Sequence, residues 1–275
     1  MTDELLSREP AVRLGVFLGV FVLMSVWECL AARRARPAAR LRRWPSNMGV
    51  SVLDGFLARL VAPAGAVGCA LLVEARGLGL FHSVAWPTPL EVMLSVVVLD
   101  FAIYWQHRLF HLVPVLWRLH RMHHADLDVD VTTGARFHPA EILLSLGIKF
   151  LVIAALGAPA VSVLAFEVLL NATSMFNHSN VRVPAAVERV LRCLVVTPDV
   201  HRVHHSILRR ETDSNFGFNL PWWDWLFRTY RAQPEAGHEA MRLGLEEFRD
   251  PVELRLGRML TQPFRQEKSG GDELR

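Results

Sequence analysis

Long apolar runs separated by short polar segments dominate the first two thirds of the chain. The first run extends from Leu14 to Ala32, and its only charged residue is Glu28. A helix rises about 1.5 Å per residue, so this run is close to the length needed to cross a hydrocarbon core of about 30 Å. The pattern therefore predicts a first membrane-spanning helix.

Two further runs predict two more spans. One extends from about Ser51 to Val73 and carries Asp54 and Arg59. These charges indicate a poorer span that is partly buried against protein. The other run extends from Leu90 to Trp105 with Asp100 inside it, and we expect it to return the chain to the first side.

A fourth apolar region is divided in two by a Gly-Ala-Pro sequence at 157–159, which is typical of a sharp turn. Its halves, Ile142–Leu156 and Ala160–Phe176, are each short for a full span. A hairpin dipping into the bilayer at about 142–176 and two true crossings are both compatible with these lengths. Lys149 and Glu167 lie inside the halves, where we expect them to pair with one another or to face the protein interior.

Basic residues cluster directly after the first run rather than before it, which is the opposite of a cleaved signal peptide. Cytoplasmic loops are rich in arginine and lysine, so the first helix is predicted to end in the cytoplasm. Counting spans from there places every histidine-rich segment on that same side. The arginines that carry this prediction are Arg33, Arg34, Arg36, Arg40, Arg42 and Arg43.

Composition supports an integral membrane protein. Hydrophobic residues make up 52% of the chain and charged residues 21%, which excludes a disordered protein. The mean hydropathy of +0.25 is high for an ordinary soluble enzyme. Three widely spaced cysteines cannot form a disulfide framework or a CxxC zinc site. The basic loop is explained by its place beside a membrane helix, so we expect no nucleic-acid partner.

Histidine is the unusual residue, because eight of the 12 histidines fall in three tight clusters. Residues three or four apart share one face of a helix, whereas adjacent residues diverge by about 100°. An adjacent pair of histidines can therefore reach two different metal ions. Neutral imidazole suits iron, zinc and copper, so the clusters predict a cage for two ions. The eight residues are His107, His111, His120, His123, His124, His201, His204 and His205.

At these residues the chain resembles the fatty acid hydroxylase/sterol desaturase superfamily. HRLFH, HRMHH and HRVHH match its HxxxH, HxxHH and HxxHH boxes. ARFHPAE, FNHSN, TPDVHRVHHS and SNFGFNLPWWDWLFRTY are also similar, so the resemblance covers about 90–230. It implies an integral membrane, non-haem di-iron enzyme that uses dioxygen to hydroxylate or desaturate a lipid.

The resemblance also implies a ligand set. The eight box histidines would bind two iron ions, with His178 as a ninth ligand. His138 would serve in either the first or the second shell of ligands. Apart from the resemblance, Asp199, Asp213 and Asn215 flank the third box, where they would orient imidazoles or lie in solvated loops. Spacing does not select the metal, because zinc binds such sites at least as well as ferrous iron and could replace it.

No nucleotide, flavin or haem signature accompanies these motifs, so electrons are expected from a separate donor, a ferredoxin or a cytochrome with its reductase. A fatty acyl chain, sterol, hopanoid, carotenoid or ether lipid would fit as substrate. The alternative function is a non-catalytic metal-binding or metal-transport membrane protein. A transport path would place ligands along the spans, whereas these boxes lie at and beyond span ends, which favours the enzyme.

The expected architecture is all-α, an integral membrane bundle with a cytoplasmic, histidine-rich di-metal helical cap. Residues 1–89 would form an N-terminal transmembrane region. Residues 90–232 would form the catalytic domain, containing the third span, the boxes and the membrane hairpin. Residues 233–275 would be a C-terminal extension that ends in a disordered polar tail from Gln262.

Overall fold

A computed structural model describes residues 2–35 and 40–266. Within these ranges the chain is helical, with two isolated β-bridges and no strand. This confirms the all-α prediction. Five segments are long and apolar enough to cross a membrane, which indicates a multi-pass membrane protein.

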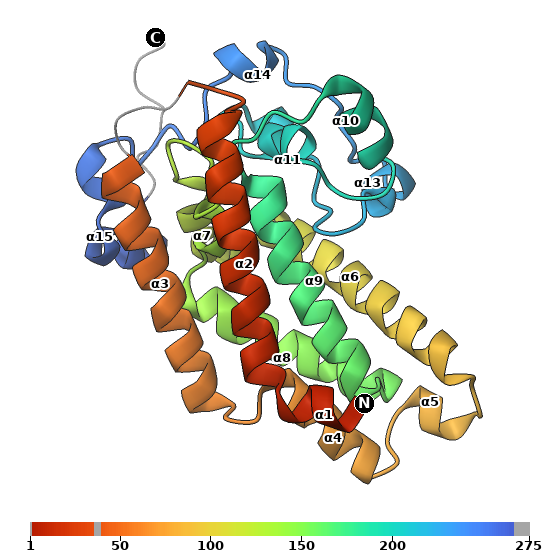
Figure 1. Ribbon diagram of the computed structural model, residues 1–275. Helices are drawn as coiled ribbons and strands as arrows, with labels where there is room; N and C mark the ends of the chain where they lie inside the picture. The colour runs from red at the N-terminus through yellow and green to blue at the C-terminus, as the bar shows by residue number, and fades with distance from the viewer. Residues whose placement is uncertain (1, 36–39, 267–275) are drawn as a thin grey trace.

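Five long helices form the body of the molecule (Figure 1). Many of their large apolar side chains are exposed on the outside of the bundle, as expected of a surface that faces lipid. The helices are α2 (Glu9–Leu30), α3 (Arg40–Val61), α6 (Thr88–Leu112), α8 (Pro139–Leu156) and α9 (Ala160–His178).

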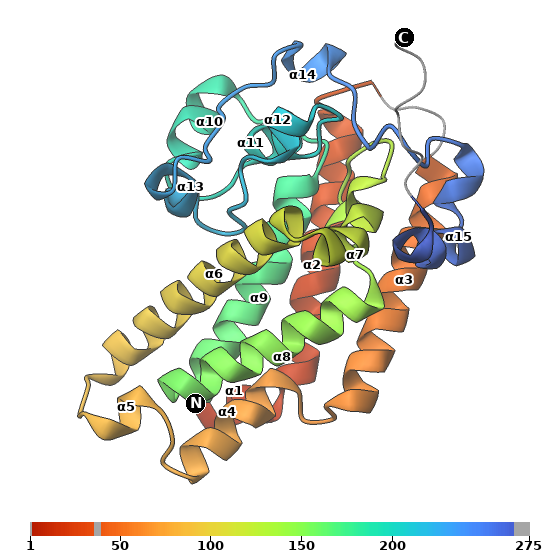
Figure 2. The ribbon, with the colours of Figure 1, turned by 180° about the vertical axis from the view of Figure 1, so that it is seen from behind.

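Short elements gather at the two ends of this bundle (Figures 1 and 2). One end carries α1 (Thr2–Ser7), α4 (Gly65–Ala75) and α5 (Leu80–Ser83). The other end carries residues 113–138 and 179–266, which we call the cap. The cap contains α7 (Pro114–His124), η1 (Thr133–Ala135), α10 (Ala185–Leu191), α11 (Pro198–His204), α12 (Arg209–Thr212), α13 (Trp222–Leu226), α14 (Gly237–Ala240), η2 (Pro251–Leu254), α15 (Leu256–Thr261) and η3 (Gln262–Phe264).

The second span begins and ends earlier than its apolar pattern predicts. Helix α3 starts at Arg40 and stops at Val61, and residues beyond Pro63 form the separate helix α4. Arginine is a good helix former, so a basic segment does not have to be a loop. Arg43 can be buried in this helix because two acidic side chains of the cap neutralise its charge. The expectation of a basic loop across 33–43 is therefore wrong for residues 40–43, which are helical. Residues 36–39, including Arg36, lie outside the described ranges.

The predicted break between the two halves of the fourth apolar region is present. Gly157 ends α8 in a left-handed conformation with φ of 69°, which glycine adopts without strain. A Cβ at this residue would lie 2.6 Å from Nδ1 of His82. The Nζ of Lys149 lies 2.6 Å from a carboxylate oxygen of Glu167, which confirms that these two charges pair between α8 and α9.

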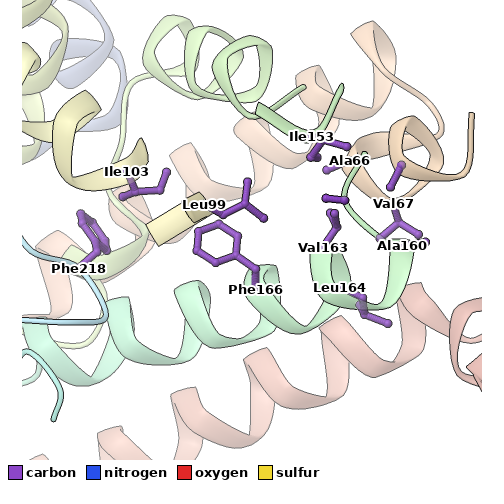
Figure 3. Packing of buried hydrophobic residues seen from close by; sticks show 12 residues of the cluster. Ala66, Val67, Leu99, Ile103, Ile153, Ala160, Val163, Leu164, Phe166 and Phe218 are labelled. Atoms are coloured by element: carbon purple, nitrogen blue, oxygen red, sulfur yellow. The ribbon is translucent and has the colours of Figure 1, made fainter. Parts of the chain in front are cut away.

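An apolar cluster holds α6 against its neighbours (Figure 3). Leu99 and Ile103 of α6 meet Val163 and Phe166 of α9 there, and Ile153 joins them from α8. Leu99, Val163 and Phe166 are almost completely buried. This packing sets the position of α6 just before the last turns of the helix, which carry His107 and His111.

The C-terminal segment is ordered further than predicted. Gln262 is buried, and its backbone carbonyl accepts a hydrogen bond of 2.6 Å from Arg121. Arg265 forms an ion pair with Glu253. The expectation of a disordered tail from Gln262 is therefore wrong up to residue 266, and the remainder of that prediction, 267–275, lies outside the described residues.

Candidate metal centre

Four helix ends bring the histidines together. His107 and His111 occupy the last turns of α6, and α7 carries the second box directly after it. Pro114 in the first turn of α7 lets the new helix start at once, since proline fits a helix N-terminus. Helix α11 carries the third box, and His178 is the last residue of α9.

Nine buried imidazoles form two groups in which all candidate ligand atoms lie within 4.8 Å of one another. Adjacent histidines of both HxxHH boxes fall into different groups, as the helical angle of about 100° requires. The five-histidine group contains His107, His111, His120, His124 and His204. The four-histidine group contains His123, His178, His201 and His205.

In the five-histidine group the Nε2 atoms are buried and have no hydrogen-bond partner. Backbone carbonyls lie 2.8 Å from Nδ1 of His107 and 2.7 Å from Nδ1 of His204. A carbonyl only accepts hydrogen bonds, so Nδ1 carries the proton in both rings and Nε2 presents a lone pair. Carboxylates of Glu141 and Asp213 lie 2.7 Å and 3.3 Å from Nδ1 of His120 and His111. These partners hold imidazoles in the form that ligates metal.

In the four-histidine group two lone pairs face one another. Nδ1 of His123 donates to the carbonyl of Arg136 at 3.1 Å, and Nδ1 of His178 donates to that of Ser174 at 2.7 Å. Their Nε2 atoms are therefore both unprotonated, yet they lie 3.1 Å apart. Nε2 of His201 lies 3.0 Å from Nε2 of His178. Nitrogen lone pairs at this distance repel unless a cation lies between them, so this group also fits a metal ion.

Burial keeps the cap histidines neutral. It is the largest cause that lowers the pKa of His123, His124, His201 and His205 well below the usual value, and repulsion from neighbouring imidazoles adds to it. Burial, with the neighbouring His120, also lowers the pKa of His204 to about 3. Neutral imidazole is the form that binds metal, so no proton has to be displaced at neutral pH.

Three other candidates from the sequence lie outside both groups. His138 caps α8, where its Nδ1 accepts a hydrogen bond of 3.2 Å from the amide of Ala140. Asp199 pairs with Arg202 of α11 at 2.5 Å. Burial alone would raise the pKa of Asp199, but the positive charge of Arg202 outweighs this effect and lowers that pKa. Asn215 donates to the carbonyl of Val200 at 2.8 Å. Asp199 and Asn215 therefore hold the third-box helix, and in the described part of the chain neither is hydrogen-bonded to any of the nine imidazoles.

Two acidic residues that the sequence reading did not assign to the site act on its histidines. One of them is Glu141 on α8, and the only indication of its role in the sequence is its position near His138 in ARFHPAE. Asp224 accepts hydrogen bonds of 2.8 Å from the amides of Phe216 and Gly217, and this turns the Phe216 carbonyl toward His107. Burial raises the pKa of Asp224 to about 6.

A buried ion cluster fixes the loop that follows the second box. Arg43 of α3 bonds Asp126 at 2.5 Å and Asp130 at 2.9 Å. Arg136 donates to the side-chain oxygen of Asn47 at 3.0 Å. Burial alone would raise the pKa of Asp126, but Arg43 and Arg136 lower it to about 2, so this carboxylate is ionised. The loop thereby places the Arg136 carbonyl that holds His123.

A cavity of about 530 Å³ reaches from the membrane part of the bundle to the five-histidine group. His107 and His120 line it, together with residues of α2, α3, α6, α8 and α9, whereas the seven other histidines of the two groups do not. Phe137 lines the cavity and stacks on the His123 ring with a centroid distance of 4.4 Å. Phe137 therefore lies between this space and the His123 ring.

The fold and these groups together define a helical membrane protein with a polyhistidine candidate metal centre. The chain belongs to the fatty acid hydroxylase family, whose model matches residues 92–229. The resemblance seen in the histidine boxes is thereby confirmed.

Several curated proteins align with about half of this chain. The ornithine lipid hydroxylase OlsE of Rhizobium tropici is 32% identical over 54% of this chain and 44% of its own length. The human alkylglycerol monooxygenase is 29% identical over 54% of this chain and 33% of its own length. Methylsterol monooxygenase 2-2 of Arabidopsis thaliana is 28% identical over 56% of this chain and 59% of its own length. The match thus spans less than two thirds of these relatives, and no solved structure matches the chain.

Proposed function

We propose that this protein is a membrane-bound lipid hydroxylase that uses dioxygen, two iron ions and electrons from a separate donor. The observation that supports this most directly is the convergence of nine buried imidazoles, with unprotonated nitrogens, beside a cavity in the membrane part of the bundle. Desaturation is the variant reaction that the same centre would allow. The relatives named as hydroxylases and monooxygenases favour hydroxylation.

In this proposal each histidine group holds one iron ion. Bound iron would supply the redox chemistry that activates dioxygen. The chain itself orients the imidazoles through carbonyls and carboxylates, and its cavity places the substrate beside His107 and His120. Phe137 keeps substrate and water away from the four-histidine group. Zinc would occupy the same nitrogens when iron is scarce.

The proposed substrate is a lipid that enters from the bilayer. Leu14 of α2 and Gly55 of α3 line the cavity and are exposed, so the cavity reaches the outer surface between these two helices. The names of the three relatives each refer to a lipid: an ornithine lipid, an alkylglycerol and a methylsterol. A lateral entry delivers such a molecule without exposing it to water.

A ferredoxin, or a cytochrome with its reductase, is the electron donor in this scheme, and the cap lies on the cytoplasmic side. Residues 90–232 would form the catalytic unit, 1–89 its membrane partner and 233–275 the closing extension. A metal transporter is the less favoured function. The nine histidines gather at one end of the bundle rather than along a path through it, as a transporter would require.

The test combines metal analysis with lipid analysis. After anaerobic purification with iron supplied, we expect about two metal ions per chain. Cells that make the protein should contain a lipid class with one added oxygen atom, and this class should be missing from cells without it. A protein with at most one ion per chain would contradict the dinuclear site. A protein with two ions and no oxygen-dependent change in any lipid would favour the non-catalytic alternative.

A further inference from the structure

Two carboxylates in the cavity each have one buried oxygen without a hydrogen-bond partner. Asp54 on α3 is only 7% exposed, and its Oδ1 is buried without a hydrogen bond. Glu141 is 4% exposed and uses Oε1 for His120, while its Oε2 is equally unpartnered. Both side chains line the same cavity as His107 and His120. An unpartnered carboxylate in such a place is costly, so each indicates a missing donor.

The basic side chains near the cavity are committed to other groups. Arg13 bonds Glu9 at 2.8 Å and Glu167 at 2.9 Å. Lys149 bonds the second oxygen of Glu167 at 2.6 Å. Arg59 donates to a backbone carbonyl at 2.7 Å and lies 3.8 Å from Glu9. In the described part of the chain Asp54 forms no ion pair.

Apart from Arg13, Arg59 and the two histidines, the rest of the cavity wall is neutral or apolar. Gln106 and Ser145 bond one another at 2.9 Å and so satisfy their own polar groups. Phe17, Phe110 and Leu170 provide apolar surface in the same cavity. The space therefore combines an apolar wall for a hydrocarbon chain with two free carboxylate oxygens for a hydrogen-bond donor.

We propose that Asp54 and Glu141 bind a protonated amine carried by the lipid substrate. An ammonium group has several N–H donors, so it can satisfy more than one unpartnered carboxylate oxygen of this cavity. Its positive charge also relieves the repulsion between two carboxylates in a cavity shielded from water. A neutral hydroxyl would donate only one hydrogen bond and leave that repulsion in place. This inference rests on the proposed function, because the amine belongs to the substrate that the metal centre would oxidise.

Binding can be measured without turnover. The probes are dodecylamine and dodecanol, which share a chain and differ in the polar group. Isothermal titration of the purified, metal-loaded full chain in neutral detergent, at pH 7 and without oxygen, gives both dissociation constants. Hydrogen bonds to charged groups are strong enough that we expect the amine to bind about tenfold more tightly than the alcohol, or better.

Variants locate the preference. Asp54→Asn keeps the side-chain volume and should abolish the preference while leaving dodecanol affinity unchanged. Asp54→Glu should retain it. Glu74→Gln, which removes an exposed carboxylate of α4 outside the cavity, should behave as the wild type and controls for attraction to the surface.

Two results would overturn the inference. One is equal affinity of the wild type for amine and alcohol, which needs no variant to fold. The other is a preference that persists in Asp54→Asn. Failure of the proposed function looks different, because the amine preference would then be present while no lipid gains oxygen. Conversely, a lipid hydroxylase with no amine preference would retain the function and remove this binding site.

Discussion

At the scale of the residue, the candidate centre depends on which nitrogen of each ring carries its proton. Backbone carbonyls hold Nδ1 of His107, His123, His178 and His204, so the four Nε2 atoms point inward as lone pairs. A carbonyl cannot lose this role by protonation, unlike a carboxylate. The chain therefore preorganises these rings before any ion binds.

Replacing single histidines should separate ligands from bystanders. His204→Ala and His123→Ala should each reduce bound metal to about one ion per chain and abolish lipid oxidation, because each removes a ligand from a different group. His138→Ala and His82→Ala should keep both ions, since neither ring belongs to a group. Elemental analysis and product assays check this. A His138→Ala protein that loses an ion would show that the ligand set is incomplete.

Glu141 should tune metal affinity through His120. Glutamine at this position still accepts a hydrogen bond from Nδ1 but carries no charge, so Glu141→Gln should weaken metal binding by about 10–100-fold. Competition with a chelator measures this affinity. Asp54→Asn is the matched control, because Asp54 lines the same cavity but, among the described residues, forms no hydrogen bond or ion pair with an imidazole. Equal chelator resistance of Glu141→Gln and wild type would contradict this role.

At the scale of the element, α3 connects the membrane bundle to the second histidine box. Its first turns bring Arg43 and Asn47 under the loop at 126–136. Helix α2 also contacts the cap from its C-terminal end. There the Glu28 carboxylate accepts hydrogen bonds from the backbone amides of Val131 and Asn180 at 2.8 Å and 2.9 Å. Two membrane helices thus hold the cap loop that carries the Arg136 carbonyl, the hydrogen-bond partner of His123.

Arg43 should matter more to stability than its neighbour on the same helix. Arg43→Met leaves Asp126 and Asp130 buried without their main cation, and breaking a buried ion pair in this way costs about 3–5 kcal/mol. Arg42→Met, at an exposed position one residue earlier, should cost little. Thermal unfolding in detergent compares the two. A melting temperature of Arg43→Met close to that of Arg42→Met would contradict the anchoring role.

The elements that could be predicted from the sequence are those with one dominant periodic signal. Helix α6 and the α8–α9 hairpin follow directly from their apolar runs and from the break at Gly157. The start of α3 could not be predicted, because its arginines look like a loop until their partners at Asp126 and Asp130 are known. Those partners lie more than 80 residues away, and local patterns carry no information about such contacts.

The candidate site divides in the same way. Spacing alone separates His123 from His124 and His204 from His205, since the helical angle does so for any helix. Spacing alone does not identify Glu141 or the carbonyl of Phe216 as partners of the rings, because these depend on how α8 and the 213–230 segment pack. His138 and Asn215 carry attractive local contexts, yet packing directs both to backbone groups.

At the scale of the whole molecule, all histidine boxes meet at one end of the bundle. Helices α2, α6 and α9 run toward the cap and α3 and α8 run away from it (Figures 1 and 2). This confirms that the boxes share one side, as the count of spans predicts. The arginines near the end of α2 predict which side faces the cytoplasm, because basic residues prefer that side.

Labelling of single cysteines should decide the orientation. Cys193 is exposed in the cap, and Arg76 is exposed at the opposite end beside α4. In a protein whose other two cysteines are serine, a membrane-impermeant thiol reagent should label Cys193 only after lysis. A protein with Arg76→Cys as its only cysteine should be labelled in intact cells. The reverse pattern would place the cap outside, away from cytoplasmic ferrous iron and reduced electron carriers. The proposed supply of electrons by a cytoplasmic donor would then fail, whatever the metal content of the protein.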